Sequence, residues 1–362
     1  MHRRNFLHAT GGVMIGSIAH ASNRLSDDSG PRLRVGQIGT QHAHAAGQLQ
    51  TVLALPQNFE MVGVVEPDPE RRRSLNDHPL YRQTQWIGEE QLFATPELSL
   101  VAVETAVRDL LPTAQRCIAA GCHVHLDKPA GESIEALERL HQTALNNKLL
   151  IQMGYMYRYN PAFQFLYEAV ERGWLGKIFE VHGVMSKKVN EATRRELAAY
   201  PGGSMFELGC HLIDPLLTIL GKPTRVTPHN RRTFEDRDDL LDNCLAVFDF
   251  ADATATIRSS LVEPDGGRRR QFVVCGTKGT LAIRPLEPPQ LQLTLEEPAG
   301  GFPAGNHHVE LASSPGRYHG AWKALWDAIR NRRPLAWSPD HDVAVQRAVL
   351  LASGFEIPGF GK

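Results

Sequence analysis

The chain has 362 residues, of which 42% are apolar and 22% charged, a composition typical of a globular protein with enough length for two domains. Its formal net charge is −1, and no basic stripe or acidic tail stands out, so a nucleic-acid partner is not expected. The five cysteines are irregularly spaced within apolar stretches, which favours buried thiols over a disulfide framework or a zinc ribbon.

The N-terminus has the features of an export signal. Arg3 and Arg4 precede a short apolar stretch that ends in a small-x-small pattern at residues 19–21. We predict a twin-arginine signal peptide over residues 1–21, a flexible leader over residues 22–32, and a periplasmic or other extracytoplasmic location. The apolar stretch is shorter than the roughly 20 residues that a membrane-spanning helix needs, so a membrane span is not expected.

The first half of the chain alternates between strand-like and helical segments. The strand-like segments read LRVGQI, EMVGVVE, TQWIG, LVAVET, HVHLDK and LLIQMGYMY. Helical periodicity separates most of them, and a helix over residues 133–148 begins with Ser133 as a capping residue. This alternation predicts an α/β fold with a doubly wound parallel sheet, that is, a Rossmann domain, over residues 33–154.

The second half, residues 155–362, has a different pattern. Two helical segments flank the strand-like run KIFEVHGVMS, and further strand-like runs follow in meander order: CLAVFDF, TATIRSSLV, RQFVVCG, TLAIRP and LQLTLEE. The stretch PAGGFPAGNHH is expected to be a loop, and two helices close the chain. The pattern predicts a C-terminal α+β domain with an open, largely antiparallel sheet.

The turn after the first strand stands where a dinucleotide-binding protein carries its phosphate loop. A G-x-G-x-x-G fingerprint aligned on Gly39 places its other two glycines at Gln41 and His44, so the sequence departs from the motif. A helix from about residue 43 to 55 is still expected after the turn, and the N–H groups of its first turn can bind phosphate. Glu66 ends the second strand and can bind the hydroxyls of a ribose, which favours NAD over NADP; a structural turn acid is the alternative.

Two further elements carry groups suited to proton transfer. Lys128 follows the fifth strand-like segment, at the carboxyl edge where α/β sheets bind ligands. Glu207, His211 and Asp214 are spaced to share one face of a helix, and a histidine beside an acid can act in acid–base catalysis. Taken singly, the lysine could be an ordinary surface residue and the histidine a buried structural one.

The order of several motifs resembles the glucose–fructose oxidoreductase / inositol dehydrogenase / MocA (Gfo/Idh/MocA) family. The matching stretches are LDKPAG, GYMYRYNPAF, ERGWLGKIFEV, GGSMFELGCHLID and VVCGTKGTLAI. The resemblance implies a nicotinamide cofactor, a sugar or polyol substrate, and a homo-oligomer that pairs through the C-terminal sheet. It also implies that Lys128 and His211 are catalytic, with Glu207 at a position where the family often has aspartate.

These considerations give a set of expected site residues. We expect the catalytic residues to be Lys128, His211 and Glu207. The expected cofactor-binding residues are Gly36, Gly39, Thr40, Gln41, His42, His44, Glu66, Thr105 and Lys128. The expected substrate-binding residues are Tyr157, Arg158, Asn160 and Asp214. The cofactor is expected to be NAD rather than NADP, and no metal is assigned.

Three interpretations compete with a simple dehydrogenase that retains its cofactor. The first is an NAD-dependent, redox-neutral glycosidase or lyase, because an exported enzyme has no pool of soluble cofactor with which to exchange. The second is a cofactor-free sugar-binding protein, which the loss of two loop glycines favours. The third is a metal site formed by two histidine pairs, His42 with His44 and His123 with His125, since alternation places the second pair on one face of a strand.

Overall fold

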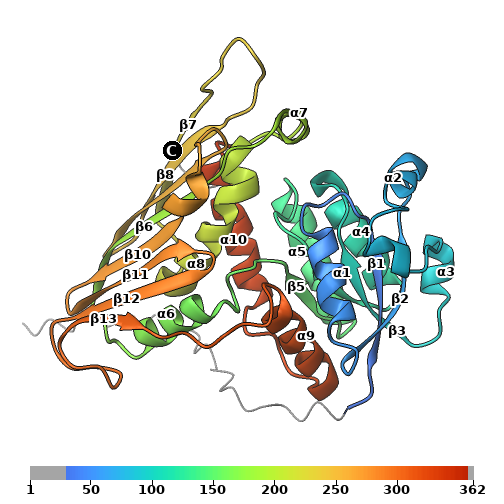
Figure 1. Ribbon diagram of the computed structural model, residues 1–362, viewed down its shortest axis with the longest axis horizontal. Helices are drawn as coiled ribbons and strands as arrows, with labels where there is room; N and C mark the ends of the chain where they lie inside the picture. Colours follow the sequence, from blue (N-terminus) through green and yellow to red (C-terminus); the bar gives the residue numbers. More distant parts are fainter. Residues whose placement is uncertain (1–29, 358–362) are drawn as a thin grey trace, which may run out of the picture.

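Two sheets organise the protein, and the computed structural model describes residues 30–357. The predicted signal peptide and most of the predicted leader lie outside the described residues. Figure 1 shows a smaller sheet and a larger sheet in separate halves, with helices between them. The predicted fold class, a Rossmann domain followed by an α+β domain, is confirmed.

The first sheet has five parallel strands in the order β2-β1-β3-β4-β5. The strands are β1 (Leu33–Ile38), β2 (Phe59–Val65), β3 (Leu98–Val103), β4 (His123–Leu126) and β5 (Ile151–Met153). The helices between them are α1 (Ala45–Leu53), α2 (Pro69–Ser74), α3 (Glu89–Phe93), α4 (Val107–Ala119) and α5 (Ile134–Asn146), with a 3₁₀ turn, η1 (Tyr81–Gln83). The central strands are almost uninterrupted runs of buried apolar residues because helices cover both faces of a parallel sheet.

The prediction of a strand at TQWIG was wrong. Trp86 makes only an isolated bridge to Val64 of β2, and its ring stacks on Tyr81 with 5.6 Å between ring centroids. The apolar residues of this segment therefore pack against the edge of the sheet instead of extending it.

The second sheet has eight strands in the order β13-β12-β11-β10-β6-β9-β8-β7. The strands are β6 (Ile178–Ser186), β7 (Arg225–Arg231), β8 (Asn243–Asp249), β9 (Thr254–Ser260), β10 (Gln271–Gly276), β11 (Gly279–Leu286), β12 (Pro289–Leu295) and β13 (Gly305–Val309). All neighbours are antiparallel except β6 and β9, which pair in parallel. The two edge strands, β7 and β13, were not predicted, and β13 lies partly in the expected loop, because edge strands bury few side chains and β7 carries a proline.

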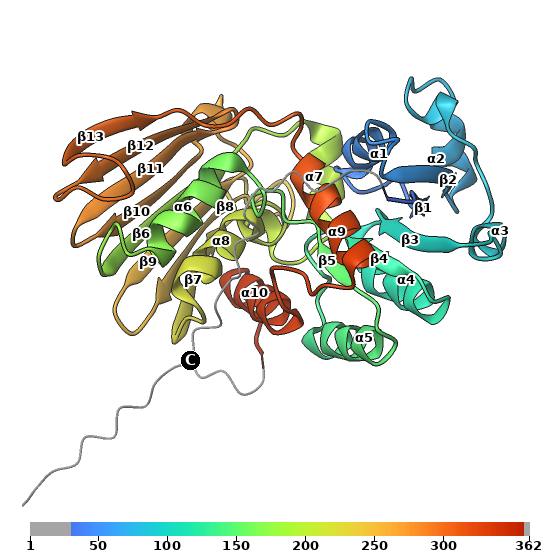
Figure 2. The same cartoon turned by 90° about the horizontal axis from the view of Figure 1, so that it is seen from below.

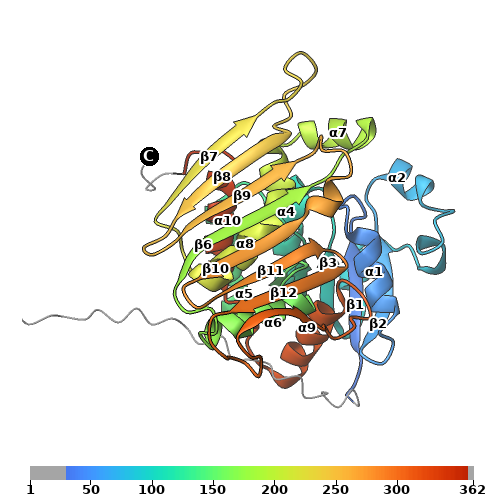
Figure 3. The same cartoon turned by 60° about the vertical axis from the view of Figure 1, so that its left-hand side comes forward.

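Helices cover one face of this sheet and leave the other open. The covering helices are α6 (Pro161–Glu171), α8 (Cys210–Leu220) and α10 (Pro339–Ala352), which lie together on one side in Figure 2. In Figure 3 the strands come forward and these helices lie behind them. A short helix, α7 (Glu191–Ala198), stands at the end of the sheet. Among residues 30–357, no helix has both the length and the apolar character needed to cross a bilayer.

The C-terminal helices connect the two halves. Helix α9 (His319–Asn331) returns to the first sheet, where the buried indole of Trp322 packs edge-on to Phe59 and donates a 2.8 Å hydrogen bond to the Gln48 side chain. Helix α10 contacts both α5 and α8. Helix α9 thus belongs to the sequence range predicted for the second domain, but it completes the hydrophobic core of the first domain. The domain boundary at residue 154 stays a prediction.

Candidate active site

A buried ion pair joins the two halves of the protein. Lys128 lies just beyond β4 with a fully buried side chain, and its Nζ donates a 2.8 Å hydrogen bond to the carbonyl oxygen of Glu207. The same Nζ lies 3.3 Å from Glu207 Oε1. Burial lowers the pKa of Lys128, but the neighbouring charges, that of Glu207 first, together raise it above its ordinary value. Burial raises the pKa of Glu207, while the neighbouring cations, Lys128 first, together bring it down to about 2. Both groups are therefore charged, and the sequence-predicted catalytic lysine and glutamate contact each other.

His211 lies one helical turn beyond this pair. A π-helical turn, η2 (Met205–Gly209), carries Glu207 and leads into α8, which begins at Cys210. Turns of this kind are frequent at functional sites because they re-aim one side chain relative to a regular helix. His211 is 2% exposed, and its Nδ1 has no hydrogen-bond partner among the described residues. Burial, then the charges of Lys128 and His44, hold the pKa of His211 well below its ordinary value, so its imidazole is neutral.

The turn after β1 approaches the end of β3 closely. Gly39 has φ of 89°, and a Cβ at this position would lie 2.6 Å from the backbone nitrogen of Thr105, so only glycine is tolerated. Glu66 Oε2 accepts hydrogen bonds from the backbone nitrogen and hydroxyl of Thr40, at 3.0 and 2.6 Å. Arg71 donates to the same hydroxyl at 2.8 Å. Four of the expected cofactor-binding residues thus meet at the turn: Gly39, Thr40, Glu66 and Thr105. The hydrogen bonds from Thr40 to Glu66 hold the loop in place.

The two loop histidines turn toward Asp127, which follows β4. His42 Nδ1 and His44 Nδ1 each lie 3.1 Å from a carboxylate oxygen of Asp127. The His44 ring lies 5.5 Å, centroid to centroid, from the ring of His211. Burial lowers the pKa of His44 to about 4, against the opposing effect of Asp127. The loop that stands in place of the glycine motif therefore lies next to His211, the expected catalytic histidine.

The histidine pair on β4 does not join this cluster, which corrects the four-histidine metal site considered from the sequence. His123 Nδ1 accepts a 2.9 Å hydrogen bond from the backbone nitrogen of Leu150. His125 Nδ1 lies 3.2 Å from the side-chain oxygen of Gln152, and its ring packs against Trp322. Both histidines serve packing between β4, β5 and α9.

Several other expected site residues have structural partners. Arg158 Nη2 lies 2.7 Å from Asp214 and 2.6 Å from Asp342, in a buried network in place of the expected substrate contacts. Asn160 caps α6 by accepting from the backbone nitrogen of Ala162. Asp214 turns toward Arg158, and its expected part in substrate binding stays a prediction.

The remaining expected residues differ in how close they lie to the site. Tyr157 is buried with its ring centroid 6.1 Å from that of His211. Gly36 lies within β1 under the Leu92 side chain, so its lack of a Cβ serves packing and not the turn. Gln41 is partly exposed at the turn.

Sequence reasoning missed two residues that line this region. Glu104 directly follows β3; it is fully buried, and neither carboxylate oxygen has a hydrogen-bond partner among the described residues. Burial, followed by Asp127, raises the pKa of Glu104 well above its usual range. Tyr318 precedes α9 with its ring centroid 5.7 Å from that of His44. The position of Glu104 at a strand end was the available signal, the same one that identified Lys128.

The turn region fits a dinucleotide on its adenosine side. Gly39 makes the tight turn that follows the first strand in dinucleotide-binding folds, and Glu66 lies at the end of β2 where a ribose is bound in this fold. Helix α1 has His44 as its N-cap residue, with no side-chain cap and no acidic residue in its first turn, which leaves its N-terminus suited to a phosphate.

Comparisons with known proteins agree with this arrangement. Residues 33–155 match the oxidoreductase family with an NAD-binding Rossmann fold, and residues 163–282 match the GFO/IDH/MocA C-terminal domain.

Curated relatives include scyllo-inositol 2-dehydrogenase (NADP(+)) IolW of Bacillus subtilis, 26% identical over 51% of this chain and 51% of that protein. The uncharacterized oxidoreductase YhhX of Escherichia coli is 25% identical over 56% of this chain and 58% of its own. The chain thus spans between half and three-fifths of the length of these relatives.

Solved structures extend the likeness of fold over most of the chain. The aldose–aldose oxidoreductase of Caulobacter crescentus has a TM-score of 0.75 at 18% identity, covering 89% of this chain and 98% of its own. The UDP-N-acetylglucosamine 3-dehydrogenase of Acidithiobacillus ferrooxidans has a TM-score of 0.74 at 18% identity, covering 89% and 97%.

Proposed function

Because the chain belongs to the Gfo/Idh/MocA oxidoreductase family, we propose that it oxidises a hydroxyl-bearing carbon of a sugar, polyol or glycoside with a nicotinamide cofactor, or catalyses the reverse reduction. The observation that carries this proposal is the buried, charged Lys128–Glu207 pair next to the neutral imidazole of His211. The nicotinamide, when bound, accepts the hydride. Gly39, Thr40, Gln41, Glu66 and Thr105 would hold the rest of the cofactor.

The roles of the side chains follow from their charges. His211 takes the proton of the substrate hydroxyl, while the Lys128 ammonium donates a hydrogen bond to the same oxygen and stabilises its developing negative charge. Glu207 keeps Lys128 protonated and in place. Proton removal at the oxygen and hydride loss at the carbon together convert the alcohol to a carbonyl.

The proposals for the cofactor and for the substrate class rest on different observations. Glu66 at the end of β2 favours NAD, although Arg71 lies close to it and the relative IolW is named as NADP-dependent. A carbohydrate substrate is supported by structural neighbours such as levoglucosan dehydrogenase, which was solved with NADH and levoglucosan (TM-score 0.73). We also propose that the protein is exported through the twin-arginine pathway with its cofactor retained, on the basis of the sequence at residues 1–21.

The His211→Ala variant tests the catalytic assignment. The unaltered full-length protein and the variant are assayed against a panel of aldoses and polyols. The rate at which each forms the carbonyl product is measured. Because loss of a general base typically costs 10²–10⁴-fold in rate, we expect a fall of that size. An unchanged rate in the variant would refute the role of His211. Cleavage of aryl glycosides without net change in the cofactor would instead support the redox-neutral glycosidase or lyase.

A further inference from the structure

The loop after β1 gathers metal-binding side chains, and we propose that His42, His44 and Asp127 bind a divalent transition-metal ion. One ligand atom from each of these residues lies within 4.8 Å of the others. The distance from Nδ1 to the nearest Asp127 oxygen is 3.1 Å for each histidine. Zinc binds nitrogen and oxygen at roughly 2.0–2.2 Å, so two ligands of a tetrahedral site lie about 3.4 Å apart. Small side-chain shifts therefore suffice to place an ion between them.

The hydrogen bonds of His42 point to a cation at its Nδ1. Its Nε2 lies 2.8 Å from the carbonyl oxygen of Lys128, which can only accept, so Nε2 carries the hydrogen. In the neutral ring, Nδ1 then carries no proton, and the backbone N–H of His44 points at it from 3.3 Å. That bare nitrogen nevertheless faces a carboxylate oxygen. A metal ion between them removes this conflict, and donation of the second ring N–H to a backbone carbonyl is usual for metal-binding histidines.

Glu104 supplies an independent observation. It is fully buried, neither of its oxygens has a hydrogen-bond partner among residues 30–357, and Oε2 lies 3.8 Å from His42 Nδ1. A buried carboxyl group without a hydrogen-bond partner among those residues thus lies beside His42, and an ion held by His42, His44 and Asp127 would supply a partner for it.

The donor set indicates the class of metal. Two imidazoles and a carboxylate suit zinc, iron, manganese or nickel, whereas calcium and magnesium prefer oxygen ligands alone. Three protein ligands also leave a coordination position open, as in catalytic zinc sites. The inference goes beyond the proposed oxidoreductase function, which does not require a metal.

Zinc binding by full-length protein without a histidine tag tests this site. The protein is treated with a chelator, titrated with Zn²⁺ without added nucleotide or sugar, and analysed for bound zinc after gel filtration. We expect one ion per chain, and binding at least tenfold weaker in His44→Gln and in Asp127→Asn. His308→Gln is the matched control, because His308 is an exposed histidine on β13, and it should bind zinc like the unaltered protein.

Two outcomes would overturn the site: an unaltered protein that retains no stoichiometric zinc, or a His44→Gln variant that binds zinc as tightly as the control. If the variants fail to fold, the visible absorption spectrum of the unaltered protein loaded with Co²⁺ tests whether the metal site exists. Absorption bands of nitrogen- and oxygen-bound Co²⁺ support the site, and a spectrum equal to that of free Co²⁺ refutes it. Since this test measures bound metal and not turnover, failure here leaves the His211→Ala test of the proposed function unaffected.

Discussion

At the scale of single residues, the site depends on a charge pair that is largely buried. Removing one partner of a buried ion pair typically costs about 3–5 kcal/mol, because the other charge stays buried and unpaired, whereas replacing both costs little. We therefore expect Glu207→Leu to lose stability of that order and the double variant Lys128→Met/Glu207→Leu to regain most of it. Urea unfolding followed by circular dichroism measures both. A double variant less stable than the single one would contradict the pairing seen here.

The sequence predicted the place of Lys128 better than it predicted the contacts of Arg158 and Asp214, for a physical reason. Lys128 was recognisable because it ends a strand at the carboxyl edge of a parallel sheet, and topology alone makes that edge a site. Arg158 and Asp214 looked like substrate groups because their partners come from distant segments. The nearest carboxylate to Arg158, that of Asp342, lies 184 positions away in the chain. The meeting of His42, His44 and Asp127 was equally invisible, because it depends on how the loop folds over β4.

At the scale of elements, the Arg158 network ties the start of α6 to α8 and α10. The guanidinium lies between the rings of Tyr155 and Trp337, 5.0 Å from each ring centroid, and binds Asp214 and Asp342. We expect Arg158→Met to lower the free energy of unfolding by about 3–5 kcal/mol, because two carboxylates lose their counter-ion.

The exposed pair of Lys177 and Asp252 provides the control for that substitution. Lys177→Met should cost less than about 1 kcal/mol, because surface ion pairs contribute little. Equal losses for Arg158→Met and Lys177→Met would show that the buried network does not hold these helices together.

The elements themselves were predictable where periodicity was strong. The inner strands and long helices match the expected segments, and Ser133 caps α5 as expected. The edge strands β7 and β13 and the π-helical turn before α8 were not expected. Edge strands lack the apolar alternation of buried ones, and a π turn arises from local packing that spacing does not reveal.

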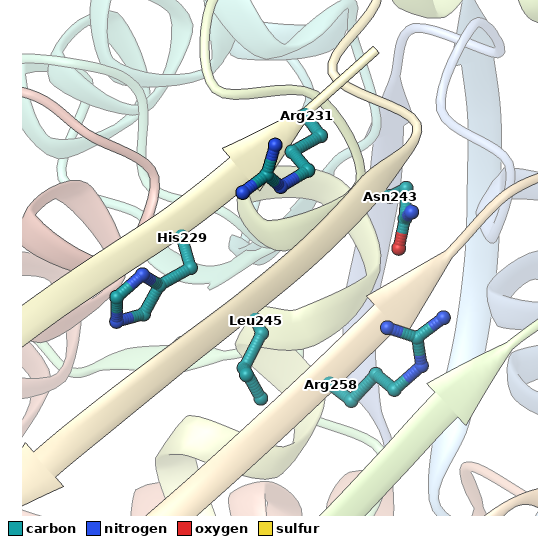
Figure 4. A pocket seen from close by; sticks show the side chains of 5 residues that line it. All are labelled: His229, Arg231, Asn243, Leu245 and Arg258. Carbon is teal, nitrogen blue, oxygen red and sulfur yellow. The ribbon is translucent and has the colours of Figure 1, made fainter. Parts of the chain in front are cut away.

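At the scale of the whole molecule, the open face of the large sheet is the surface proposed to pair copies of the chain. Figure 4 shows a hollow on this face lined by His229, Arg231, Asn243, Leu245 and Arg258. We expect the full-length protein to be a dimer or larger by sedimentation, and Leu245→Arg to shift it toward the monomer by adding a cation beside Arg258. Leu145→Arg is the control, since Leu145 is 54% exposed on α5. Unchanged mass in Leu245→Arg would place the interface elsewhere.

The two-domain plan was predictable because strand–helix alternation and a meander of strands are each typical of one architecture. The return of α9 to the first sheet was not, since the periodicity of a helix does not say which sheet it will cover.

The central claim is that this chain binds a nicotinamide dinucleotide at the turn holding Gly39 and Glu66 and uses it beside Lys128 and His211. The most direct measurement is mass spectrometry and absorbance of the supernatant after purified full-length protein is denatured. The account predicts NAD⁺ or NADH at close to one molecule per chain. A supernatant free of nucleotide, together with no binding of added NAD⁺ or NADP⁺ to the native protein, would contradict it.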